Sequence, residues 1–438
     1  MSKVYIGINK ANPRETVEWD TSSLVNGHWI IVGGSGSGKT YRICDIAKQL
    51  QTQDVHVRIF DPHEDIETDP AYTSVVEFSE SSPYGINPLA INPSPMYGGV
   101  RKRITSLIRT INKYSSRLNE REEAVMRYAL RELYAWHGFD YKDPETWQTG
   151  TKRMPTLEDL HRFIYGKLRG FILGHMYEVA DLFDRLNEGL IELRRLQRYG
   201  EMEKTKQRTA NDALSEHHRR SLGALRKELA AVFDRCIETA EAGDLEQYIH
   251  YESKEVLKSL FDRVEKMRAL GVFKPTPPPF DARKPIWRYD MRSLYVEEQG
   301  YLVELTLEQL FSDAIQRGFR AEVDHLYFID EAQRFISPED QDHIMSVIFR
   351  EIRKFGGGLV LATQNCACFP TDVIVNSGTK MILGVDEAYQ DILAAKLGVE
   401  RLRFIQPRKN ALVQIKTKTA SVGSRFIDTL FSLPQANS

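Results

Sequence analysis

Eight residues near the start of the chain have the types and spacing of a phosphate-binding loop. They read Gly33-Gly34-Ser35-Gly36-Ser37-Gly38-Lys39-Thr40 and fit the template G-x-x-x-x-G-K-[ST] at every position. In such a loop the backbone N–H groups surround the phosphates, and glycines stand where a side chain would block the approach. Lys39 would reach the β and γ phosphates, and the Thr40 hydroxyl would hold Mg²⁺. The sequence therefore predicts ATP and Mg²⁺ as cofactors.

Two adjacent acids form a second candidate group. Asp330 and Glu331 follow the apolar run 326–329. In phosphate-loop enzymes the first such acid secures Mg²⁺ and the next can polarise the attacking water. Many strands end in acids, so this pair alone is weak. Together with the loop at 33–40, it predicts Asp330 as a metal residue and Glu331 as the catalytic acid.

Two further residues stand just after predicted strands. Asp61 follows the run 55–60, and ligands of open α/β sheets sit at the carboxyl ends of strands. Asp61 could orient water or the outer shell of the metal; the alternative is a turn built on Asp61-Pro62. Gln364 follows the buried run 359–362 and is the predicted sensor of the γ-phosphate.

Two arginines are candidates for a role in a neighbouring subunit. Arg350 and Arg353 lie near the end of a helix predicted over 344–355. Either one could reach a neighbour's nucleotide as an arginine finger and stabilise charge in the transition state. Ion pairing at the surface, for instance with Glu351, is the alternative.

The elements around these residues alternate between strand and helix. The loop follows an apolar run of strand type at 28–32 and precedes a helical pattern at 41–50. Further strands are predicted at 4–8, 17–19, 286–290, 380–385 and 411–415, and a further helix at 305–318. This alternation predicts an α/β fold, with a mainly parallel sheet flanked by helices.

The middle of the chain has a different character. Residues 101–275 read as helical and charged, with Asn119 and Glu122 spaced as a capping box. Acids and bases alternate over 179–242, which suggests an exposed helical hairpin or an arm that faces a partner. The predicted organisation is a first part of the ATPase core at 1–100, including a short N-terminal β-hairpin, a helical insertion at 101–275 and a second part of the core at 276–438.

Composition narrows the class of protein. A chain of 438 residues allows two or three domains, and 42% hydrophobic with 27% charged residues is ordinary for a soluble protein. The sequence shows no apolar run near the roughly 18 residues of a membrane span and no signal peptide, so we expect a cytoplasmic protein without membrane insertion. The net charge of −2 gives no overall signature of nucleic-acid binding. It does not exclude such binding, because a ring with a basic channel can hide its charge from a sum over the whole chain.

In this order the motifs resemble the FtsK/HerA superfamily of ring-forming motor ATPases, and most closely its HerA branch. The resemblance is carried by residues 28–33, 61–63, 87–89, 328–332, 350–356 and 362–364. It implies a RecA-like P-loop core, a homohexameric ring with ATP between subunits, and translocation of double-stranded DNA through the central channel.

The resemblance also implies roles for single residues. Lys39 and Thr40 would bind phosphate and Mg²⁺, Asp330 and Glu331 would be the metal and catalytic acids, and Gln364 the sensor. Arg350 or Arg353 would be the finger.

The sequence departs from the family pattern at its N-terminus. Relatives that act in DNA-end resection carry an N-terminal β-barrel that docks a nuclease, whereas here the loop begins at residue 33. Compact members of this kind stand beside effector enzymes in bacterial antiphage defence, so a nuclease or other effector is an expected partner. Two alternatives to a DNA translocase or helicase stay open: an oligomeric scaffold that regulates a partner enzyme, and a conjugation- or secretion-type ATPase.

Overall fold

The computed structural model describes residues 2–173 except 149, residues 253–399 except 340–342, residues 405–431 except 420–424, and the single positions 191, 227, 230, 231, 234, 251 and 402. The charged hairpin predicted over 179–242 lies almost entirely outside the described residues. The chain divides into two units, the first built from Met1–Ser116 with Leu270–Ser438 and the second from Arg117–Ala269.

Unit 1 contains an 11-stranded sheet with the order β2-β1-β11-β10-β9-β3-β8-β7-β4-β6-β5. The strands are β1 (Lys3–Asn9), β2 (Thr16–Asp20), β3 (Trp29–Val32), β4 (His56–Asp61), β5 (Thr73–Glu77), β6 (Ile286–Asp290), β7 (Arg320–Ile329), β8 (Phe355–Thr363), β9 (Thr379–Ile382), β10 (Asn410–Ile415) and β11 (Ile427–Leu430). From β9 to β5 all neighbours are parallel, whereas β10, β11, β1 and β2 extend the sheet as antiparallel strands. The predicted α/β class with a mainly parallel sheet is therefore confirmed.

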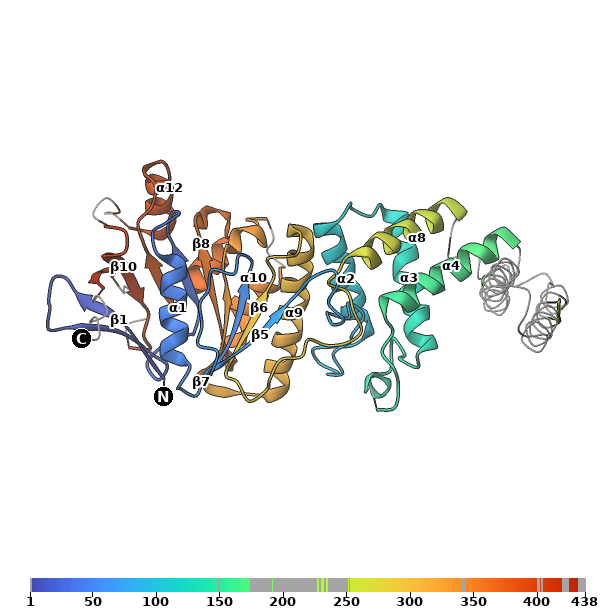
Figure 1. Cartoon of the computed structure of the whole chain (residues 1–438), viewed down its shortest axis with the longest axis horizontal. Helices are drawn as coiled ribbons and strands as arrows, with labels where there is room; N and C mark the ends of the chain where they lie inside the picture. The colour runs from blue at the N-terminus through green and yellow to red at the C-terminus, as the bar shows by residue number, and fades with distance from the viewer. Residues whose placement is uncertain are drawn as a thin grey trace, which may run out of the picture. The chain divides into compact units, whose positions relative to one another are not determined.

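Helices cover both faces of this sheet (Figure 1). The helices of unit 1 in the described residues are α1 (Lys39–Leu50), α2 (Val100–Tyr114), α9 (Val296–Arg317), α10 (Ile344–Glu351), α11 (Thr371–Asn376) and α12 (Glu387–Leu397), with the short 3-10 helices η2 (Ala332–Arg334), η3 (Ile352–Lys354) and η4 (Cys366–Cys368). Helix α1 buries Ile43, Ile46 and Leu50 in one cluster with the strands of the sheet, as its apolar spacing requires. Helices α9 and α10 pack against β8 outside that cluster, on the other face.

Helix α2 belongs to unit 1, because its apolar stripe of Ile104, Leu107, Ile108 and Ile111 is buried and the helix packs against α9. The first part of the core thus reaches residue 116 in the structure and resumes at residue 270. The prediction from composition put these limits at 100 and 276, because α2 is charged on its outer face like the helices that follow it.

Two elements are longer than their patterns predicted. Helix α9 begins at Val296, and its residues 298–305 are all buried, so that stretch has no amphipathic period to detect. Strand β8 begins at Phe355 and runs through Gly356-Gly357-Gly358, a sequence typical of a loop. A Cβ at Gly358 would lie 2.3 Å from the carbonyl oxygen of Gly27, so this close approach of two backbones requires glycine there.

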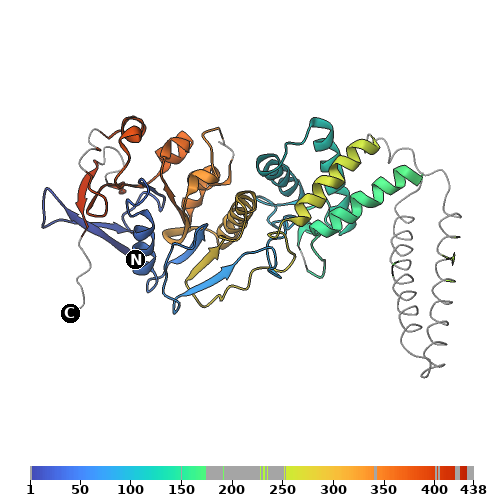
Figure 2. The same ribbon diagram turned by 45° about the horizontal axis from the view of Figure 1, so that its top comes forward.

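Unit 2 is helical in its described residues. It contains α3 (Glu120–Trp136), the 3-10 helix η1 (Pro144–Trp147), α4 (Leu157–Leu173) and α8 (Lys254–Ala269). The predicted capping box opens α3: Asn119 Oδ1 accepts from Glu122 N and Glu122 Oε2 accepts from Asn119 N, both at 2.9 Å. Helices α4 and α8 lie side by side, as Figures 1 and 2 both show.

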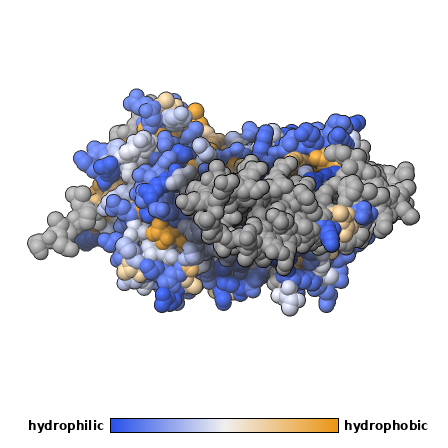
Figure 3. Space-filling view, turned by 45° about the vertical axis from the view of Figure 1, so that its right-hand side comes forward, coloured by the Kyte–Doolittle hydropathy of each residue, from blue (hydrophilic) through white to orange (hydrophobic). Residues whose placement is uncertain are grey.

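Among the residues that the structure describes, no helix has both the length and the apolar composition needed to cross a bilayer. Figure 3 shows a face on which hydrophilic residues predominate and the coloured apolar residues form only small patches.

Candidate nucleotide-binding and hydrolysis site

The glycine-rich loop lies at the carboxyl end of β3 and leads directly into α1. Gly36 and Gly38 have φ of 72° and 101°, values that favour glycine. The loop is tied to the strands on either side of β3, since Gly33 N donates to Thr363 O at 3.1 Å and Gly34 N donates to Gly384 O at 2.8 Å. The sheet therefore holds the loop in a curved form before any ligand arrives.

Lys39 lies inside this loop. Its Nζ donates to the carbonyl oxygens of Gly33 at 2.9 Å and Gly34 at 3.2 Å. Burial lowers the pKa of Lys39, and the negative charges of Glu331 and Asp330 oppose that shift. The ammonium group is thus bonded to carbonyls that phosphate oxygens can replace.

Asp330 follows the last residue of β7 and is 4% exposed. Its Oδ1 accepts from the backbone N–H of Glu331 at 2.9 Å. Burial raises the pKa of Asp330 to about 6, with the charge of Glu331 adding to the shift and that of Lys39 opposing it. Asp330 is a buried carboxylate with no ion pair among the residues that the structure describes. Together with the Thr40 hydroxyl at the start of α1, it is a donor set that suits Mg²⁺ completed by phosphate oxygens.

Glu331 occupies a conformation that is uncommon for a residue with a side chain. Its φ and ψ are 49° and 41°, in the left-handed region. Gln364 Nε2 donates to both of its carboxylate oxygens, at 3.1 and 3.3 Å. Strand β8 lies between β3 and β7, so Gln364 at its tip stands between the loop and the acids.

Gln333 is a site residue that the sequence analysis missed. Its Nε2 donates to Glu331 Oε2, and its Oε1 accepts from the Thr363 hydroxyl at 2.8 Å. The Thr363 bond fixes which end of the amide faces Glu331. The position of Gln333, two residues after the acid, was the only available signal.

Asp61 lies at the carboxyl end of β4, next to β7 in the sheet, and is fully buried. Its two oxygens accept from the N–H groups of His63 and Ile66, both at 3.2 Å, and Arg288 lies 3.7 Å away. Burial raises the pKa of Asp61, and these hydrogen bonds and Arg288 oppose the shift. The contacts of Asp61 are those of a turn-forming residue, the alternative that its sequence context left open.

The two candidate arginines lie at the opposite edge of the sheet. Arg350 lies in the last turn of α10 and pairs with Asp372 at 2.7 Å, and Arg353 is an exposed residue of η3. Both precede β8, whereas the nucleotide loop and the acids follow their strands. Within one subunit these arginines are therefore about a strand's length from the site, and only a neighbouring subunit could bring one to a nucleotide.

A cavity of about 550 Å³ continues from the loop to residues near the end of the chain. Arg408 and Phe431 line it together with Tyr41 and Arg42 of α1. The Arg42 guanidinium lies 3.5 Å from the centroid of the Phe431 ring. No motif marks these residues, because their pairing joins positions almost 400 residues apart.

Part of the sequence is similar to a known family, and the fold is similar to that of solved structures. Residues 4–169 match the family model described as "Helicase HerA, central domain". The structure of VirB4 of Thermoanaerobacter pseudethanolicus matches with a TM-score of 0.61 and 15% identity, covering 99% of this chain and 97% of that chain. Plasmid coupling protein TrwB in complex with a non-hydrolysable ATP analogue matches with a TM-score of 0.49 and 12% identity, covering 99% and 95%.

No curated protein matches the sequence. The match to VirB4 extends the similarity in fold over the whole chain, beyond the residues matched by the family model. The resemblance to the HerA branch is therefore confirmed over residues 4–169 by the family model, and VirB4 has a similar fold over the whole chain.

Proposed function

We propose that this chain is a HerA-type ATPase that couples ATP hydrolysis to the translocation or processing of double-stranded DNA, as a ring of identical subunits in the cytoplasm. One observation carries the hydrolytic part: Lys39, Asp330, Glu331 and Gln364 converge at the carboxyl ends of the adjacent strands β3, β8 and β7. The DNA part rests on the match to the HerA central domain.

The residues divide the chemistry between them. The loop N–H groups and Lys39 bind the phosphates, for which Lys39 exchanges its bonds to Gly33 and Gly34. Thr40 and Asp330 would hold Mg²⁺, which neutralises charge on the phosphates. Glu331 orients the attacking water and accepts its proton, while Gln364 links the γ-phosphate to that acid through its amide.

Steady-state ATP hydrolysis by the purified chain with Mg²⁺ tests this proposal, measured alone and with duplex or single-stranded DNA. We expect stimulation by duplex DNA. Hydrolysis that is indifferent to DNA would favour the oligomeric scaffold that regulates a partner enzyme, and binding of Mg·ATP without hydrolysis would overturn the enzyme assignment. The variant Lys39→Ala, which should not bind nucleotide, is the control.

The ring and the trans finger need a separate experiment. Light scattering with and without Mg·ATP gives the number of subunits. If Arg353 acts in trans, mixing Arg353→Ala subunits into wild-type rings lowers hydrolysis more than in proportion to their share. A strictly proportional loss would count against Arg353, and the same titration with Arg350→Ala tests the other candidate.

A further inference from the structure

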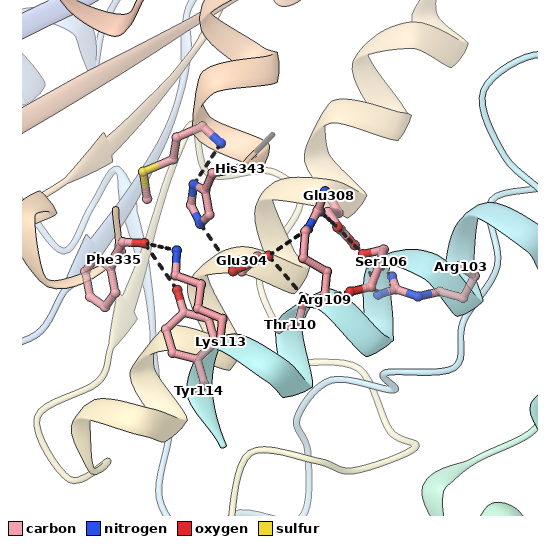
Figure 4. Close-up of polar contacts among 11 residues, drawn as sticks. Arg103, Ser106, Arg109, Thr110, Lys113, Tyr114, Glu304, Glu308, Phe335 and His343 are labelled. Atoms are coloured by element: carbon pink, nitrogen blue, oxygen red, sulfur yellow. Dashed lines mark hydrogen bonds and ion pairs between the residues drawn. The ribbon is translucent and has the colours of Figure 1, made fainter. Parts of the chain in front are cut away.

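The last turn of α2 contacts the segment that follows the two acids. Lys113 Nζ donates to the carbonyl oxygen of Phe335 at 2.6 Å, and the Tyr114 hydroxyl donates to the same oxygen at 3.3 Å (Figure 4). Lys113 and Tyr114 are both partly buried. A bond from an ammonium group in such surroundings is stronger than a bond between neutral groups.

Phe335 closes the short turn that starts on the catalytic acid. Arg334 N donates to Glu331 O at 2.9 Å, and Phe335 N donates to Ala332 O at 3.1 Å. The Phe335 side chain is 1% exposed, so both its ring and its carbonyl are fixed. A shift of Phe335 would move this turn, and the bond from Arg334 N to Glu331 O would pass the shift on to Glu331, which already holds an unfavourable left-handed conformation.

Helix α9 packs closely against the last turn of α2. A Cβ at Gly300 of α9 would lie 2.2 Å from Cε1 of Tyr114, so the tyrosine ring fills the space that this glycine leaves. The ring also packs on Tyr301, with centroids 5.4 Å apart. Because Tyr114 fits so closely, the last turn of α2 has little freedom to move.

A buried carboxylate ties the same helices to the far end of the segment. Glu304 of α9 accepts from the Thr110 hydroxyl of α2 at 3.1 Å and contacts His343 Nε2 at 3.2 Å (Figure 4). His343 Nδ1 accepts from Met345 N at 3.3 Å, so Nε2 carries the proton and donates to Glu304. Both ends of the stretch from Phe335 to His343 are therefore held by α2 and α9.

We propose that Lys113, supported by Tyr114, is a positioning residue for hydrolysis: its bond to the Phe335 carbonyl sets the geometry of Glu331. This inference rests on the proposed ATPase function. It also makes α2, which ends three residues before the helical unit begins, an element whose displacement would change turnover.

The test compares Lys113→Met with Lys102→Met. Lys102 is on the same helix and makes a bond of the same length to a backbone carbonyl, that of Met96 at 2.6 Å, but far along the helix from Glu331. Because small displacements at a reacting centre are costly, we expect Lys113→Met to lower kcat by about tenfold to a hundredfold. The Kd for Mg·ATP should stay within about twofold, since no loop contact changes, and Lys102→Met should leave kcat unchanged.

Two further variants keep the test decisive if Lys113→Met folds poorly. Lys113→Arg retains a donor and should restore most of the rate, whereas Tyr114→Phe removes the longer bond, keeps the ring and should lower kcat by about threefold. Normal kcat in Lys113→Met, or equal losses in both lysine variants, would overturn the inference while leaving the ATPase assignment intact. Absence of hydrolysis by the wild-type protein would instead overturn the proposed function, and this inference with it.

Discussion

Two clusters of buried charge lie in unit 1, and their surroundings shift the pKa of a buried carboxyl in opposite directions. At the nucleotide loop, Lys39 is bonded to loop carbonyls, and burial raises the pKa of Asp330 to about 6. Between α2 and α9, Glu304 is just as buried. There the hydrogen bond from His343 and the charges of His343, Lys113 and Arg109 outweigh burial, so the pKa of Glu304 is lowered.

The two clusters also differ in their ion pairs. On α9, Glu308 pairs with Arg103 at 3.0 Å and with Arg109 at 3.1 Å, and it also accepts from Ser106 (Figure 4). Charges that are matched inside the protein can stabilise the packing of two helices. Charges left without a direct partner cost stability in the free protein and are available to a ligand, which is how binding sites differ from structural networks.

The largest expected effect concerns Glu331, in the cluster of charges at the nucleotide loop. Glu331→Gln keeps the shape of the side chain but cannot accept a proton, so we expect kcat to fall by about a thousandfold. Nucleotide binding should persist, as measured by the Kd of a fluorescent ATP analogue. Ordinary turnover by this variant would remove Glu331 from its proposed role.

The next largest effect concerns Glu304, in the cluster of paired charges between α2 and α9. In Glu304→Gln the amide N–H₂ must face either the Thr110 hydroxyl or His343, and the charge that balances Arg109 is lost. We expect the free energy of unfolding to fall by about 3 kcal/mol, as for other broken buried pairs, measured by urea denaturation at pH 8. An unchanged midpoint would show that this network does not hold α2 to α9.

At Asp330 we expect a substitution to raise the free energy of unfolding, where the substitution at Glu304 lowers it. Because its folded pKa is raised, the folded protein binds this proton more tightly than the unfolded chain does. The contribution of Asp330 to stability is therefore lost as the pH rises from about 4 through about 6. Above pH 7 and without nucleotide, Asp330→Asn should raise the free energy of unfolding by about 2 kcal/mol.

That gain has two internal controls in the same urea experiment. It should vanish near pH 4, where the wild-type carboxyl is protonated, and it should reverse with saturating Mg·ATP, since the asparagine is a poorer metal ligand. A destabilised Asp330→Asn at pH 8 would mean that both clusters are structural, and the comparison between them would fail.

Much of the fold could be predicted from local patterns. The loop at 33–40, the strand before Asp330 and the helices with one apolar stripe each leave a periodic or spaced signature within a few residues. The bounds of elements without such a local signature were harder to predict. Residues 298–305 of α9 are buried all round, and Gly358 of β8 is required by its contact with the distant backbone at Gly27.

The sequence by itself determined which residues can bind phosphate and which acids can serve the chemistry, because a phosphate loop and a strand ending in acids are short-range features. Only the tertiary structure decided what surrounds them. The amide of Gln333 on Glu331, Phe431 over Arg42, and Lys113 on the Phe335 carbonyl follow from strand order and helix packing. The last two join residues separated by more than 200 positions, and such contacts form only when the whole sheet and its helices fix both partners in place.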